Sequence, residues 1–133
     1  MTTWLVVEDE PDLIEMFQAT TELMGVDSLI FSSGEDALDW IDTVEQGHFA
    51  GEAPVLALLD IRLSGEVTGV MVSALLRECP QLKAMTLVLM TAYRLSPAWE
   101  QVMLSQSGAD LLLYKPLPAF KDLRRLLQSL IRQ

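Results

Sequence analysis

Five short, mostly apolar runs recur along the chain, and the stretch after each run has apolar residues at helical spacing. The runs are Trp4-Leu5-Val6-Val7, Ser28-Leu29-Ile30-Phe31, Val55-Leu56-Ala57-Leu58-Leu59, Leu87-Val88-Leu89-Met90 and Leu111-Leu112-Leu113-Tyr114. Apolar runs of this length without strict alternation are typical of strands that are buried on both faces of a parallel sheet. The pattern therefore predicts strand and helix alternating five times.

The residues that flank the predicted helices support this alternation. They include Pro11 and Gly25 around the first helix, Ser32 with Glu35 as a capping box for the second, and Pro80 after the third. Ser96-Pro97 opens the fourth helix, which stops near Gly108, and the last helix runs from about Pro118. Right-handed crossovers turn such a chain into an α/β fold, a parallel sheet with helices on both faces.

Composition narrows the class of function. The 133 residues are 50% hydrophobic and carry a formal net charge of −10, which predicts one domain over residues 1–133 and argues against general affinity for nucleic acids or anionic membranes. The single cysteine, Cys79, excludes an internal disulfide and fits a reducing compartment. We find neither a signal peptide nor a membrane-spanning run, and expect a cytoplasmic protein without direct contact to nucleic acid or membrane.

Polar side chains follow four of the five predicted strands. If these strands are neighbours, their carboxyl ends bring Glu8, Asp9, Asp60, Thr91 and Lys115 to one edge of the sheet. Carboxylates held close together repel one another, and a hard divalent cation, Mg²⁺, with oxygen ligands is the usual remedy. A carboxylate can also attack phosphorus, with a hydroxyl and an ammonium stabilising the transferring oxygens. These residues together indicate phosphoryl transfer to Asp60.

The chain resembles the receiver domain of two-component response regulators, of the chemotaxis-regulator type. The resemblance rests on Val6-Val7-Glu8-Asp9-Glu10-Pro11, Leu58-Leu59-Asp60, Met90-Thr91-Ala92 and Gly108-Ala109-Asp110 leading to Tyr114-Lys115-Pro116. It covers Trp4 to about Ile131. The resemblance implies a flavodoxin-like (βα)5 fold in three layers with sheet order 2-1-3-4-5.

The same resemblance implies a set of roles. Asp60 would accept a phosphoryl group from a phosphohistidine on a sensor histidine kinase or a phosphotransfer protein. Asp9 and Asp60 would bind Mg²⁺ through carboxylates and Arg62 through its backbone carbonyl, while Glu8 would act through water. Thr91 and Lys115 would contact the phosphoryl group. Such a domain is a signalling module rather than an enzyme, although it assists its own phosphotransfer and dephosphorylation.

The sequence departs from the family pattern at several positions. Leu112 stands where many members have an aromatic switch residue, and Tyr114 lies on the same side of the strand by two-residue alternation. The usual proline four residues after the phosphorylated aspartate is Ser64, and the following glycine comes one residue late, at Gly69. We therefore expect an altered switch and an unusual path for this loop, with the nucleophile and cation ligands unaffected.

Arg62 and Tyr93 are expected at the rim of the site, where family positions tune the lifetime of the phosphorylated state. Our hypothesis is that Arg62 pairs with Glu8 or a neighbouring acid and that Tyr93 hinders the attacking water. The alternative is that both side chains lie in solvent.

Output is expected through a partner protein or an effector domain outside this chain. In the family, partners or a second copy bind the face of the fourth helix, fifth strand and fifth helix, which here is expected to include Leu95, Trp99, Lys121, Arg124 and Arg125. The alternative for Trp99 is a buried side chain. Two other classes stay open. One is a degenerate receiver that acts as a phosphorylation-independent interaction module, and the other is a metal-dependent phosphohydrolase, in which Arg62 would occupy the place of a second acid.

Overall fold

The computed structural model describes residues 2–131, and these form five strands and five helices. The strands are β1 (Thr3–Val7), β2 (Asp27–Phe31), β3 (Leu56–Asp60), β4 (Thr86–Thr91) and β5 (Leu111–Tyr114). The helices are α1 (Pro11–Met24), α2 (Gly34–Glu45), α3 (Gly69–Glu78), α4 (Pro97–Ser107) and α5 (Phe120–Ile131). Each strand lies within one residue of its predicted bounds at either end.

All strand pairs are parallel, and the sheet order is β2-β1-β3-β4-β5. β1 and β3 therefore lie side by side at the centre although some 50 residues separate Val7 from Leu56 in the sequence. The α/β class, the flavodoxin-like fold and the strand order expected from the sequence are confirmed.

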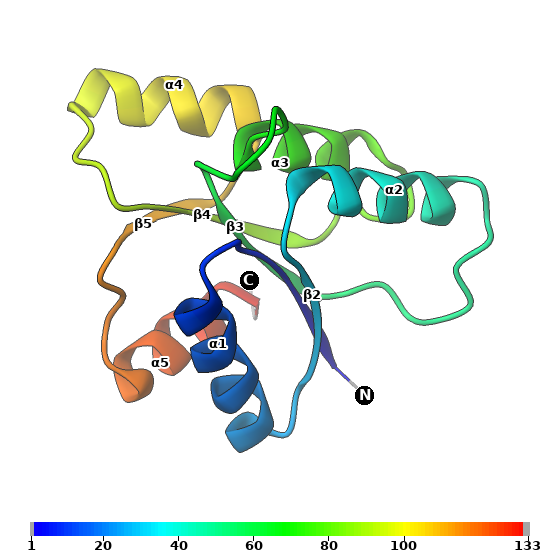
Figure 1. Cartoon of the computed structure of the whole chain (residues 1–133), viewed down its shortest axis with the longest axis horizontal. Helices are drawn as coiled ribbons and strands as arrows, with labels where there is room; N and C mark the ends of the chain where they lie inside the picture. Colours follow the sequence, from blue (N-terminus) through cyan, green and yellow to red (C-terminus); the bar gives the residue numbers. More distant parts are fainter. Residues whose placement is uncertain (1, 132–133) are drawn as a thin grey trace.

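The sheet separates two apolar cores, because alternate residues of each strand point to opposite faces. Leu5, Val7 and Leu59 pack on the side of α2 and α3, whereas Trp4, Val6 and other residues of the opposite set pack on the side of α5. Figure 1 shows α2, α3 and α4 over one face of the sheet and α1 with α5 over the other. Strands β1, β3 and β4 are buried on both faces, which explains their unbroken apolar runs.

Two predicted helix starts are wrong by one or two residues. The residue that caps α2 is Ser33 rather than Ser32, since the Ser33 hydroxyl accepts a hydrogen bond from the Asp36 N–H at 3.1 Å. Glu35 does not complete a capping box because its carboxylate turns away to accept from the Glu66 N–H. Helix α5 begins at Phe120 rather than near Pro118.

The cysteine and the expected lack of a membrane-spanning run can be compared with the described residues. Cys79 is buried at the end of α3. Among the helices of residues 2–131, none combines the length and apolarity of a membrane span.

Candidate functional site

The ends of four neighbouring strands bring the predicted site residues to one edge of the sheet. Asp60 is the last residue of β3 and Thr91 the last residue of β4, while Glu8 and Lys115 directly follow β1 and β5. The register places Asp60 opposite Met90, so Thr91 lies one residue beyond on the adjacent strand. The Lys115 N–H donates to the Thr91 carbonyl at 2.8 Å, which continues the β4–β5 pairing to the lysine.

The Lys115 ammonium joins two acids from distant parts of the sequence. Its Nζ donates to Glu8 Oε1 at 2.7 Å and to Asp60 Oδ2 at 3.0 Å. Glu8 is 0% exposed and Asp60 is 6% exposed, so both acids are buried, whereas Lys115 is partly exposed. A buried carboxylate needs such a partner, because an unpaired charge in this environment is strongly destabilising.

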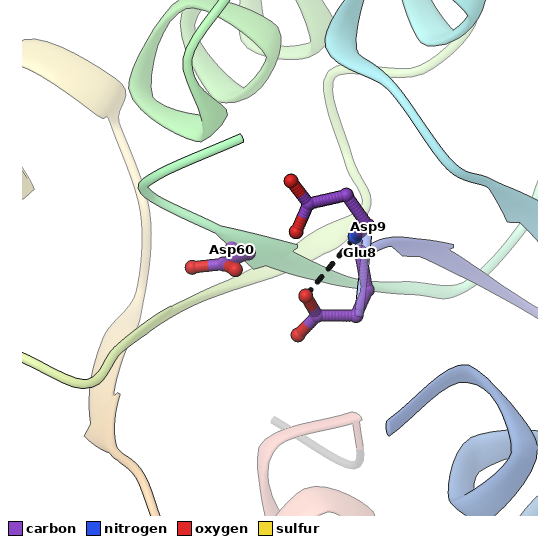
Figure 2. Close-up of side chains that lie close together, drawn as sticks. All are labelled: Glu8, Asp9 and Asp60. Atoms are coloured by element: carbon purple, nitrogen blue, oxygen red, sulfur yellow. Dashed lines mark hydrogen bonds between the residues drawn. The ribbon is translucent and has the colours of Figure 1, made fainter. Parts of the chain in front are cut away.

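Asp9 completes a cluster of three carboxylates. One carboxylate oxygen from each of Glu8, Asp9 and Asp60 lies within 4.8 Å of the other two. Figure 2 shows the Asp9 and Glu8 side chains projecting from the end of β1 beside Asp60 at the end of β3. Three acids with one ammonium leave an excess of negative charge, and clustered oxygen ligands suit a hard divalent cation. The chemistry of these ligands therefore fits Mg²⁺.

Backbone N–H groups hold each carboxylate of the cluster. The Glu8 Oε2 atom accepts from the N–H groups of Asp9 and Glu10, at 3.0 and 3.2 Å. Asp60 Oδ1 accepts from the Arg62 N–H at 3.3 Å, and Asp9 Oδ2 accepts from the Ser64 N–H at 2.8 Å. The acids are thus oriented by backbone N–H groups of the segments that follow β1 and β3, before any ligand contributes.

The ionisation of the site reflects its burial. Burial raises the pKa of Asp60 to about 6; the hydrogen bond from Lys115 opposes this shift and the nearby Glu8 adds to it. Burial lowers the pKa of Lys115, but its hydrogen bonds to Glu8 and Asp60 outweigh this effect, and the pKa is raised above its usual value. At neutral pH Lys115 is therefore an ammonium and Asp60 is a carboxylate, which is the nucleophilic form.

The proposed pairing of Arg62 with Glu8 or a nearby acid is wrong. Glu8 forms its salt bridge with Lys115, and within the described part of the chain no salt bridge joins Arg62 to an acid. The Arg62 guanidinium instead lies over the ring of Tyr93, with 4.4 Å from its central carbon to the ring centroid. Tyr93 is 54% exposed. The pair joins the loop after β3 to the loop after β4.

Leu112 and Tyr114 differ in their surroundings. Leu112 packs against the core on the α2 and α3 side and has no polar group to exchange partners. The Tyr114 hydroxyl donates to Glu100 on α4 and accepts from the Leu95 N–H at 3.3 Å. The hydrogen bond to Glu100 raises the pKa of Tyr114 above its usual value. Tyr114 thus connects β5 to the β4–α4 loop and to α4.

Two further residues near the site were missed by the sequence analysis. Glu35 accepts a hydrogen bond from the loop that follows β3, and the Ser64 N–H in that loop binds Asp9. The position of Gly69, nine residues after Asp60, signalled an unusual loop. The sequence did not indicate that Glu35 binds this loop, because Glu35 and Glu66 are 31 residues apart and no local pattern connects them.

Comparison with known proteins identifies the family. The family model for the response regulator receiver domain matches residues 4–128. No curated protein sequence gives a significant match. A receiver domain protein from Methanospirillum hungatei is 22% identical, with a TM-score of 0.75 over 99% of this chain and 94% of that one.

Two other solved structures are similarly close in fold. The receiver domain of sensor histidine kinase PA1611 from Pseudomonas aeruginosa is 22% identical, with a TM-score of 0.78 over 99% of this chain and 98% of that one, and it contains a magnesium ion in its active site cleft. The BeF3-activated receiver domain of Klebsiella pneumoniae RstA is 26% identical, with a TM-score of 0.76 over 99% of this chain and all (100%) of that one.

The matched residues include all four strand ends that form the site, so fold, site geometry and family comparison agree. The chain therefore belongs to the response regulator receiver domain family, the signalling modules of two-component systems.

Proposed function

We propose that this domain accepts a phosphoryl group on Asp60 and signals through the resulting change in a protein-binding face. The observation that supports this most strongly is the Lys115 ammonium, which contacts both Glu8 and Asp60 while Asp9 completes the acid cluster. A structural ion pair would need one acid, whereas phosphoryl transfer needs the additional carboxylates and the cation.

In this proposal each residue has a defined task in the transfer. An Asp60 carboxylate oxygen attacks phosphorus, so that a P–O bond forms as the P–N bond to the donor phosphohistidine breaks. The Lys115 ammonium, now hydrogen bonded to Asp60, stabilises one phosphoryl oxygen. The Thr91 hydroxyl, which accepts from the Tyr93 N–H at 3.1 Å, retains its own hydrogen for donation to another.

The Mg²⁺ ion would be held by the carboxylates of Asp9 and Asp60 and by the backbone carbonyl of Arg62. Glu8 would contribute through water, because its carboxylate already forms a salt bridge with Lys115. When bound, the cation neutralises the negative charge of the carboxylates and of the phosphoryl oxygens. The acid cluster thus provides the ligands, and Lys115 keeps Glu8 and Asp60 at the separation that they show here.

The phosphodonor in this proposal is a phosphohistidine on a sensor histidine kinase or a histidine phosphotransfer protein. Asp60 is buried, but Asp9 and Lys115 beside it are only partly buried, so the site opens to solvent next to the nucleophile. A donor histidine must therefore approach along the edge of the sheet that carries the strand ends.

The output face in this proposal is formed by α4, β5 and α5. Trp99 is 56% exposed, so the alternative of a buried side chain is wrong. All four residues of β5 are partly exposed. Lys121, Arg124 and Arg125 lie together with Gln128 and Ser129 on one face of α5. An apolar strand edge beside a basic helix suits a protein partner or a second copy of the chain.

Tyr114 supplies a connection between the site and this face. It pairs with Thr91 in the β4–β5 register and binds Glu100 of α4 through its hydroxyl. In this proposal Tyr114, rather than Leu112, transmits a movement of the β4–α4 loop to α4.

The proposal is tested by incubating the protein with Mg²⁺ and a small phosphodonor such as acetyl phosphate, followed by intact-mass measurement. We expect one phosphoryl group per chain, none in Asp60→Asn, and normal labelling of Asp36→Asn as a matched control. No modification of the wild type would indicate an interaction module without phosphorylation. Steady release of phosphate without any phosphorylated protein at Asp60 would indicate a phosphohydrolase.

A further inference from the structure

The loop between β3 and α3 is held to the rest of the domain by hydrogen bonds of its backbone, by the packing of Leu63 and Val67 against the core, and by the contact of Arg62 with Tyr93. At its two ends, the Ile61 N–H donates to the Met90 carbonyl at 2.8 Å, and the Gly69 N–H donates to the Ile61 carbonyl at 3.0 Å. In its middle, the Ser64 N–H donates to Asp9 and the Glu66 N–H donates to Glu35. One of these two middle contacts ends on a carboxylate of the acid cluster, and the other ends on α2.

The Glu35 side chain is exposed, and its carboxylate lies against the backbone of this loop. Its Oε2 atom accepts from the Glu66 N–H at 3.0 Å, and this hydrogen bond is the main reason why the pKa of Glu35 is lowered. Gly65 has φ +94°, and a Cβ added there would lie 2.7 Å from Glu35 Oε2. The absence of a side chain at Gly65 therefore lets the backbone turn around the carboxylate.

The start of α2 and the end of the loop are also in direct contact. A Cβ added to Gly34 would lie 2.6 Å from the Val67 carbonyl oxygen, and one added to Gly69 would lie 2.0 Å from the Asp60 carbonyl oxygen. The loop thus has little freedom at Val67 and Gly69. Between Leu63 and Glu66, the loop backbone donates hydrogen bonds to Asp9 and to Glu35.

We propose that Glu35 is a positioning residue for the cation site, because it fixes the loop that supplies the Ser64 N–H to Asp9 and the Arg62 carbonyl to the site. This inference rests on the proposed function. Glu35 itself lies outside the acid cluster and would act only through the loop. Without it, the middle of the loop loses one of these two hydrogen bonds, and the ligands are less well oriented for a cation.

The expected effect is a weaker cation site in a folded protein. Removing a residue that orients metal ligands typically weakens metal binding by about tenfold or more. We expect Glu35→Ala to raise the dissociation constant for Mg²⁺, measured by isothermal titration calorimetry, about tenfold. Asp36→Ala is the matched control, since it removes an exposed acid from the same first turn without touching the loop, and we expect a change below about twofold.

A second measurement separates positioning from a general loss of charge or structure. In ¹H–¹⁵N spectra, Glu35→Ala should shift the amide signals of Ser64 and Glu66 and leave those of β4 in place, whereas Asp36→Ala should leave the Ser64 signal in place. Equal Mg²⁺ affinities of Glu35→Ala and Asp36→Ala would overturn the inference. If Glu35→Ala does not fold, Glu35→Gln is compared with Asp36→Asn in the same way, and equal affinities again overturn it.

The two proposals fail in different ways. If the wild type binds no Mg²⁺ and Asp60 accepts no phosphoryl group, the proposed function is wrong. If the wild type does both and Glu35→Ala still binds Mg²⁺ like the wild type, only the role of Glu35 is wrong.

Discussion

At the scale of single residues, the ionisation of the buried Asp60 carboxyl changes the folding stability of the protein. Its pKa is about 6 in the folded chain, against 3.8 for an unperturbed aspartate. Well below pH 3.8 this carboxyl is protonated in both the folded and the unfolded chain, so its ionisation does not affect folding stability there. As pH rises from about 4 to 6, the unfolded chain releases this proton first, and folding stability falls until the folded state ionises as well.

Asp60→Asn removes this dependence, and we expect it to stabilise the metal-free protein by about 1–3 kcal/mol at pH 8, with little gain at pH 4. The measurement is urea denaturation of both proteins in EDTA at the two pH values. An equal gain at pH 4 and pH 8 would show that packing rather than ionisation is responsible.

The Arg62 guanidinium rests on the aromatic ring of Tyr93, so the contact is lost when the ring is removed. We expect Tyr93→Ala to speed dephosphorylation about two- to fivefold, because the ring no longer holds the Arg62 guanidinium beside the site and water gains access. The decay of the phosphorylated protein is followed in EDTA-quenched time points by intact mass. Leu23→Ala, at a 75% exposed position on α1, is the control and should not change the rate. An unchanged rate in Tyr93→Ala would remove the shielding hypothesis.

At the scale of elements, Arg77 joins several parts of the fold at the opposite edge of the sheet. From α3 it donates to the carbonyls of Lys83 and Met85 at 2.7 Å and of Gly108 at 2.9 Å, and it pairs with Asp110 at 3.0 Å. Asp110 in turn accepts from the Leu87 N–H at the start of β4. One guanidinium thus links α3 to the entries of β4 and β5.

We expect Arg77→Met to lower the free energy of unfolding by about 2–4 kcal/mol, because several carbonyl groups lose a charged donor at once. Urea denaturation at pH 7 measures this loss. Lys83→Met removes a nearby exposed cation that makes no side-chain hydrogen bond among residues 2–131 and should change stability by less than about 0.5 kcal/mol. Similar losses in both variants would mean that net charge, not the linkage, matters.

At the scale of the whole molecule, the acid cluster adds local repulsion to a chain of net charge −10. A cation that binds only the folded state stabilises it, and at about ten times the dissociation constant the gain is about 1.4 kcal/mol. For a domain of this size we expect the melting temperature to rise about 3–6 °C in Mg²⁺ relative to EDTA.

Calorimetry at constant ionic strength measures this rise, and Asp9→Asn should largely abolish it because one ligand is removed. A rise that persists in Asp9→Asn would point to general screening of the net charge. The same comparison shows whether the cluster, rather than the surface as a whole, binds the cation.

Much of this architecture follows from local patterns. The apolar runs of β1, β3 and β4 and the helical spacing between them predicted the order of elements, since burial on both faces of a sheet requires such runs. The polar residues at the carboxyl ends of the predicted strands indicated which side chains lie together at that edge of the sheet. Helix starts were less accurate: Ser33 caps α2 rather than Ser32, because Glu35 has a tertiary partner that competes with the local capping box.

The sequence by itself determined the alternation of strands and helices and the placement of Glu8, Asp9, Asp60, Thr91 and Lys115 at strand ends, because these depend on periodicity and chain direction. Only the tertiary structure decided that Lys115 takes Glu8 and Asp60 as partners, that Arg62 lies on Tyr93, and that Glu35 holds the β3–α3 loop. Such pairings depend on distances between side chains that are far apart in the sequence, and several acids compete for each cation. Periodicity carries no information about which of them lies within reach.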